Sequence, residues 1–118
     1  MSYMLLIVEP TDQRGSRSEA EGHLVYERML RFTETLKSRG VLQAGASLAS
    51  IDARSAQVQV RGGQRRVVDG PYAEAKEMVG GFFLLDCATR EEAIAYAAEC
   101  PAAEWCSVEV RKVGPCWD

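Results

Sequence analysis

Apolar positions along the chain fall into short runs and one long segment with helical spacing. The first run, from Tyr3 to Val8, ends at Glu9-Pro10 and is too short for a helix, so it predicts a buried strand. Between about residues 18 and 39 the apolar positions recur at helical spacing, at Val25, Met29, Phe32 and Leu36. This spacing predicts an amphipathic helix, and Gly40 supplies a common helix end.

The middle of the chain predicts three further strands. Residues 41–48 form the first of them, and their glycine and alanines imply close backbone packing or a bulge. Val58 and Val60 alternate with polar residues, and Gly62-Gly63 provides the positive φ angles of a tight turn before residues 65–69 run back. This pattern predicts a β-hairpin.

The last third of the chain predicts a strand, a helix and a strand. Residues 81–87 are almost continuously apolar, as in a strand buried on both faces, so we expect this strand to be central. Thr89 and Glu92 form a capping-box pattern that begins a helix ending near Glu99. Val108 and Val110 then alternate with polar residues in a closing strand.

The order of the elements is βαβ, a hairpin and βαβ. It predicts a single α+β domain over residues 1–118 with a ferredoxin-like fold, in which an antiparallel sheet carries both helices on one face. Because the first and fifth strands have apolar residues at odd and even positions alike, the other face also needs cover. We therefore expect a homodimer in which two copies meet through this sheet face.

Composition and charge narrow the classes of partner. With 47% hydrophobic and 26% charged residues, the 118-residue chain has the composition of a globular domain with its own core. The net charge is -3 and the basic residues form no long run, so nucleic acid is not an expected partner. No segment has the length of a membrane span or the pattern of a signal peptide, so we expect no membrane partner and a cytoplasmic location with reduced cysteines.

Cofactor sites are not expected either. The chain has one histidine, His23, and its four cysteines form no CxxC pair, so the usual His/Cys ligand set for a metal is missing. No glycine-rich loop follows a strand in the pattern that binds phosphates. We therefore predict no metal and no nucleotide.

The segment least like a generic scaffold runs from Asp69 to Glu77 and reads Asp-Gly-Pro-Tyr-Ala-Glu-Ala-Lys-Glu. It closely resembles the DGPF(AET/AEA)KE signature of the DGPF-type proteins within the YCII-related family. Other stretches are similar to that family as well: Met4 to Ile7, Gly80 to Phe83, Glu92-Ala93, Pro101 to Ala103 and Val108 to Arg111. The resemblance spans nearly the whole domain.

The resemblance implies a dimeric, ferredoxin-like α/β barrel. In the wider family a histidine and an aspartate are proposed to form a catalytic pair, and one class of members removes hydrogen chloride from a chlorinated, lactone-like compound. Asp69 matches the aspartate position. When the first helix is aligned by its Gly40 end, a residue other than histidine stands where the family's histidine would fall. We therefore leave His23 out of the expected site.

Three residues of the motif are the expected site residues. Asp69 is assigned as an acid or base, Lys76 as the group that holds an anion or carbonyl, and Tyr72 as a stacking or hydrogen-bonding ring. One turn of helix would place Tyr72 near Lys76. Structural readings stay open beside these roles: residues 69–71 also suit a turn, the charged residues also suit an exposed ion-pair cluster, and the tyrosine ring also suits packing.

Two functions from different classes follow. The first is a lyase or isomerase that needs no metal or nucleotide and acts on a small anionic or cyclic metabolite. The alternative is a non-catalytic ligand-binding or regulatory module, because genes of DGPF-type proteins in bacteria often neighbour those of extracytoplasmic-function sigma factors. Only the first function requires a group that transfers protons.

Overall fold

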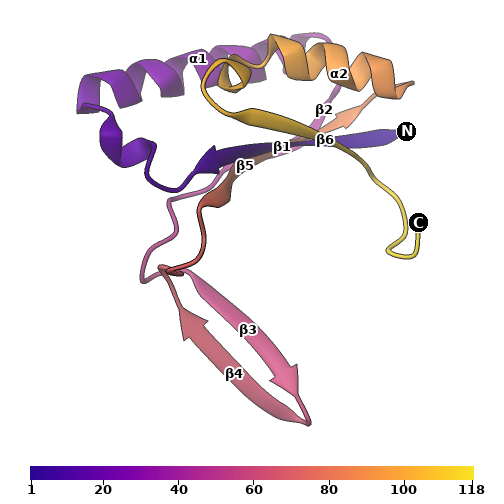
Figure 1. The fold of residues 1–118 in the computed structure, drawn as a ribbon. Coiled ribbons are helices and arrows are strands. Elements are labelled where there is room, and N and C mark those ends of the chain that lie inside the picture. Colours follow the sequence, from indigo (N-terminus) through magenta and orange to yellow (C-terminus); the bar gives the residue numbers. More distant parts are fainter.

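The computed structural model describes residues 1–118, and its elements come in the expected order (Figure 1). The strands and α-helices are β1 (Ser2–Pro10), α1 (Glu19–Ser38), β2 (Leu42–Ser47), β3 (Ala56–Arg61), β4 (Gln64–Asp69), β5 (Glu77–Asp86), α2 (Arg90–Glu99) and β6 (Ser107–Lys112). Two short 3₁₀ helices, η1 (Arg14–Ser16) and η2 (Pro101–Glu104), precede α1 and follow α2. Each predicted element is confirmed, although β5 begins at Glu77, before the apolar run at 81–87.

Four strands form an antiparallel sheet in the order β2-β5-β1-β6. In this order β5 lies between β1 and β2, and β1 lies between β5 and β6, so each helical connection crosses over one strand. That is the arrangement of a ferredoxin-like α+β fold. The predicted central position of β5 is confirmed, and both helices lie on one face of the sheet (Figure 1).

Side-chain caps determine where the two α-helices begin. At α1, Ser18 Oγ accepts a hydrogen bond from Glu21 N, and the Glu21 carboxylate accepts one from Ser18 N, both at 3.2 Å. At α2, Thr89 Oγ1 accepts from Glu92 N at 3.1 Å. Gly40 follows α1 with a φ of 72°, as the predicted helix end requires. Neither helix is long and apolar enough to cross a bilayer.

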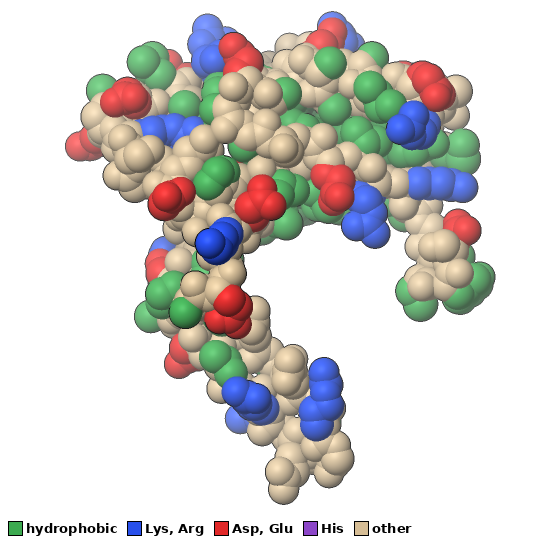
Figure 2. Space-filling view, in the orientation of Figure 1, with side chains coloured by type: hydrophobic (Ala, Val, Ile, Leu, Met, Phe, Trp, Pro, Cys, Tyr) green, Lys and Arg blue, Asp and Glu red, His purple; other side chains and the backbone are tan.

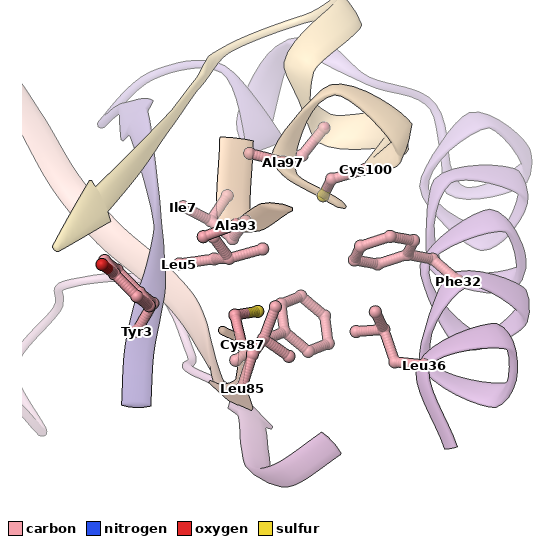
Figure 3. Packing of buried hydrophobic residues seen from close by; sticks show 12 residues of the cluster. Tyr3, Leu5, Ile7, Phe32, Leu36, Leu85, Cys87, Ala93, Ala97 and Cys100 are labelled. Carbon is pink, nitrogen blue, oxygen red and sulfur yellow. The ribbon is translucent and has the colours of Figure 1, made fainter. Parts of the chain in front are cut away.

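The core lies between the helices and the sheet face that they cover (Figure 3). Leu5 of β1, Leu36 of α1 and Leu85 of β5 are fully buried. Phe32 of α1 meets Phe83 of β5 edge to face, with ring centroids 5.2 Å apart. The core cluster is completed by Tyr3, Ile7, Cys87, Ala93, Ala97, Cys100 and Ala102. Burial of these apolar side chains holds α1 and α2 on the sheet.

The opposite face of the sheet has no helix over it (Figure 1). We call this surface the open face, and its apolar residues are Met4, Leu6, Val8, Ala44, Ala46, Val79, Phe82 and Leu84. They alternate along β1 and β5 with core residues, so these strands are apolar on both faces, as predicted. Glu109 and Arg111 of β6 lie opposite Leu6 and Met4 and give the open face a polar border.

Two segments project on the side of the open face (Figure 1). The first is the hairpin of β3 and β4, residues 56–69, which we call the arm. Gly62 and Gly63 at its tip have φ values of 58° and 78°, as the predicted tight turn requires. The second is residues 113–118, which we call the tail. The open face therefore lies between two projections, and Figure 2 shows the space that they leave beneath it.

Replacing Leu36 by alanine should lower the free energy of unfolding by about 2–5 kcal/mol, because it opens a cavity between α1 and the sheet. Urea unfolding followed by circular dichroism measures this loss. Leu24→Ala is the matched control on the same helix: its side chain is 60% exposed, and the change should stay below about 0.5 kcal/mol. Equal losses in the two variants would contradict the assigned face of α1.

Candidate functional site

The expected site residues lie at the base of the arm and in the loop that follows it. Asp69 is the last residue of β4, is exposed and lies opposite Ala56. Tyr72 is half-buried and lines a hollow of about 290 Å³ on the arm, which we call the arm hollow. Lys76 is exposed, and neither Lys76 nor Asp69 lines the arm hollow. The roles assigned to these residues stay predictions.

Gly70 has a structural reason to be glycine. A Cβ atom there would lie 2.5 Å from the carbonyl oxygen of Asp52, which no side chain tolerates without a backbone shift. Gly70 N also donates a hydrogen bond to Ser55 O at 2.8 Å. These contacts join the chain segments that enter and leave the arm, so the turn reading accounts for this position of the motif.

The segment after Gly70 is a turn instead of the expected turn of helix. Ala75 N donates to Tyr72 O at 3.0 Å, and no helix forms between residues 71 and 76. The backbone is held elsewhere, since Thr11 N donates to Lys76 O at 3.0 Å and ties the loop to the end of β1. The prediction that one helical turn brings Tyr72 beside Lys76 is therefore wrong.

A cleft of about 930 Å³ lies between α1 and the β2 side of the sheet, and we call it the α1 cleft. Ala44, Gly45 and Ala46 of β2 line it, and Gly45, which lies opposite the core residue Phe83, has no side chain to fill the space beneath the helix. Tyr26 and Met29 of α1 form part of the opposite wall. The cleft is larger than the arm hollow and has the apolar lining with a few charged groups that is typical of small-molecule sites.

His23 lies in this second region. It is exposed near the start of α1 and lines the α1 cleft, whereas Asp69 does not. The structure thus does not bring the histidine and the motif aspartate together in this cleft.

An ion pair between a buried carboxylate and a partly exposed arginine lies in the α1 cleft. The Glu9 side chain is only 5% exposed, and Nε of Arg14 lies 2.6 Å from its Oε1. Arg14 also donates hydrogen bonds to the carbonyl oxygens of Leu48, at 2.8 Å, and Gly80, at 3.2 Å. A buried carboxylate is costly without a partner, so Arg14 makes the position of Glu9 possible.

Gly80 leaves the space that this ion pair occupies. A Cβ atom at Gly80 would lie 2.6 Å from Glu9 Oε1 and 2.8 Å from Arg14 Nη2. Both distances are shorter than van der Waals contact, so any side chain at this position would displace one member of the pair.

Arg17 is a second cation of the α1 cleft, and it forms no ion pair. Its guanidinium lies 5.6 Å from the ring centroid of Trp105, which also lines the cleft. Gln13 Nε2 donates to Trp105 O at 2.6 Å and holds this residue at the cleft. The charge of Arg17 is therefore positioned but not neutralised.

The pKa of the Cys106 thiol is affected by two charged residues of the cleft. Burial raises the pKa of its thiol, the Glu9 carboxylate raises it further, and the Arg17 guanidinium lowers it. Glu9 and Arg17 thus act on the Cys106 thiol in opposite directions. No group of three His, Cys, Asp or Glu side chains forms a metal-binding cluster.

Sequence reasoning missed Glu9, Arg14 and Arg17. A signal for Glu9 was present: Tyr3, Leu5 and Ile7 are the core-facing positions of β1, and Glu9 continues that alternation. A charged residue at a core-facing position demands a buried partner, and that requirement pointed to a nearby arginine.

Comparison with known proteins finds similarity over nearly the whole chain. A family model described as the YCII-related domain matches residues 1–116. The chain is also 30% identical over 99 residues to an uncharacterized protein of Rhizobium meliloti (strain 1021), an alignment that covers 84% of this chain and 79% of that protein.

Replacing Gly80 by alanine should lower the free energy of unfolding by about 1–3 kcal/mol, because the added methyl group displaces the Glu9–Arg14 pair. Gly22→Ala in α1 is the control, since a Cβ atom there meets nothing within 4 Å. That change should raise the stability by about 0.5–1 kcal/mol. Thermal or urea unfolding of both variants checks the pair, and a Gly80→Ala protein as stable as wild type would contradict the described packing.

Proposed function

We propose that this chain, which belongs to the YCII-related family, binds a small organic anion in the α1 cleft and transfers a proton there through Glu9. The observation that carries the proposal is the Glu9 carboxylate, which is 5% exposed and yet lines a cleft of about 930 Å³. A carboxylate that borders a cleft and has little contact with water suits a general base.

The cations of the cleft favour an anionic ligand. Arg14 is engaged by Glu9 and two carbonyl groups, whereas Arg17 has no ion-pair partner. A guanidinium can hold a carboxylate through two parallel hydrogen bonds, so Arg17 is the group that anchors the ligand. Tyr26, Met29 and Phe83 offer apolar surface to the rest of the molecule.

The supported reaction class is a lyase or isomerase that needs no metal and no nucleotide. Glu9 takes the proton of a C–H bond next to a carbonyl group, and the electron pair of that bond forms a new C=C double bond. In an isomerisation, the carbonyl group becomes an enolate and the proton returns to a different carbon. In an elimination, a leaving group departs with its own bonding pair, and the proton stays on Glu9 until water removes it.

A non-catalytic module, including one that serves sigma-factor signalling, would use the same cleft without proton transfer. The DGPF-like motif is the competing location for the chemistry, with Asp69 as acid or base and Tyr72 and Lys76 as ligand contacts. One pair of variants, Glu9→Gln and Asp69→Asn, separates these possibilities, because each keeps the shape of its side chain and removes its charge.

We expect wild-type protein in D₂O to catalyse exchange of a proton next to the carbonyl group in at least one member of a panel of small organic acids and lactones. Proton NMR detects this exchange without knowledge of the product. Glu9→Gln should slow the exchange by at least about 100-fold, because it removes the base. It should keep the shift in melting temperature that the same compound produces.

Asp69→Asn is the matched control and should exchange protons at the wild-type rate. Loss of exchange in Asp69→Asn with retention in Glu9→Gln would transfer the chemistry to the motif. A compound that raises the melting temperature but never exchanges would support the binding module, and a full wild-type rate in Glu9→Gln would overturn the role of Glu9.

The assembly that fits this fold is a homodimer, a dimeric α/β barrel in which the open faces of two copies cover each other. The support is the apolar stripe of β1, β5 and β2, which has a polar border on β6 as interfaces commonly do. A two-fold axis places the same surface on both sides, so each copy covers the other.

Replacing Leu84 by glutamate should weaken this dimer by at least about 100-fold, because it buries an unpaired charge in the centre of the open face. Sedimentation equilibrium measures the dissociation constant. Leu24→Glu on α1, an exposed position on the helix side, should leave the constant unchanged. An equally stable dimer in Leu84→Glu, or a monomeric wild type, would exclude the open face as the interface.

A further inference from the structure

The arm has no extensive contact with the other helices and strands of its own chain. Among the elements, β3 and β4 pack extensively only against each other, and every residue from 56 to 69 is exposed. Val58 and Val60 are 62% and 58% exposed. A two-stranded hairpin is marginally stable by itself in water, so the arm needs another surface to hold it.

The two faces of the arm differ. Val58 and Val67 lie opposite each other on one face, and neither lines the arm hollow. The other face carries Gln59 opposite Arg66, and together with the loop after β4 it forms the arm hollow. The face with the arm hollow is therefore the one that can receive a side chain from another molecule.

The tail carries a large apolar side chain that is exposed to water. Trp117 is 86% exposed, the most exposed of the large hydrophobic residues. A turn in which Asp118 N donates to Pro115 O at 3.0 Å presents it. Figure 2 shows apolar side chains gathered at the end of the tail, across the open space from the arm.

We propose that Trp117 of each copy packs into the arm hollow of a second copy, an inference that rests on the dimer proposed above. The arm and the tail project from opposite ends of the open face toward the same side (Figure 1). A two-fold axis that passes between them, perpendicular to the line that joins them, brings each arm to the partner's tail.

Charge favours this arrangement over one that pairs the two arms. Three arginines, at 61, 65 and 66, and one aspartate give the arm a net charge of +2, so the rest of a chain with net charge -3 carries -5. A contact between the two arms would bring two basic clusters together, whereas a contact between the arm and the partner's tail brings the arginines toward Asp118.

The lining of the arm hollow suits an indole ring. Val68, Pro71 and Tyr72 provide apolar and aromatic surface. Arg66 supplies a cation for the ring face, and Glu74 supplies an acceptor for the indole N–H. Tyr72 of the motif then has a packing role in the dimer.

An engineered disulfide tests the contact. Gln59→Cys places a thiol in the arm hollow, and Cys116 next to Trp117 is already present and exposed. Oxidised glutathione accepts the two electrons when the thiols join, and a disulfide forms only where the two Cα atoms approach to about 4.4–6.8 Å. Cys87 and Cys100 are buried, and burial raises the pKa of both thiols, so they compete little for the oxidant.

We expect Gln59→Cys to give a covalent dimer on a non-reducing gel, and we expect Gln59→Cys with Cys116→Ser to give none. Glu27→Cys on α1 is the control for random collision and should give none either. Trp117→Ala should weaken the dimer by at least about 10-fold in sedimentation equilibrium, because a large buried ring is lost.

Each other outcome decides between the two proposals. A dimer in solution without the Gln59→Cys link to Cys116 would overturn the arm–tail contact and leave the open-face dimer standing. A covalent dimer that survives Cys116→Ser would mean that arm meets arm. A monomeric wild type at every concentration would remove both the dimer and the contact.

Discussion

The sheet is apolar on both faces, but the chain has helices for only one of them, and most features of the molecule depend on this constraint. Leu5 and Leu85 anchor the covered side by packing under α1 and α2. The residues that alternate with the core residues along β1 and β5 form the open face, which no helix of the same chain covers. Apolar area of this kind is stabilising only when removed from water, and a second copy, which the arm and the tail would contact, is the cover that we propose.

The α1 cleft results from a lack of large side chains in most of β2. After Leu42 and Gln43, β2 contains only small residues, and Gly45, on the sheet face under α1, adds no side chain to the space there. Glu9 and Arg14 form an ion pair beside the cleft, and Gly80 makes room for the pair because it has no side chain. A buried charge contributes little to stability when compared with an apolar packing, which is why a chemical role for Glu9 is the natural reading of its position.

Much of the fold could be predicted because local rules determine it. Ser18 and Thr89 cap the helices, Gly40 and Gly62-Gly63 take the left-handed angles expected of them, and the apolar run at 81–87 is the central strand. The candidate site could not be predicted in the same way. The cleft depends on how α1 lies over β2, and the partner of Glu9 depends on the 3₁₀ turn at Arg14. Glycine is required at position 70 because a Cβ atom there would clash with the carbonyl oxygen of Asp52, which is distant in sequence. The sequence alone does not reveal this contact, so the motif suggested a catalytic site more strongly than its contacts do.

Hydrogen–deuterium exchange of the arm at several protein concentrations shows whether a second copy covers the surfaces that this chain leaves bare. In such a dimer the backbone amides of β3 and β4 are protected at high concentration and lose protection as dilution separates the copies. The amides of β5, which pair with β1 and β2 in one chain, should change much less. Fast exchange of the arm at every concentration would contradict the account, because it would show a hairpin that nothing covers.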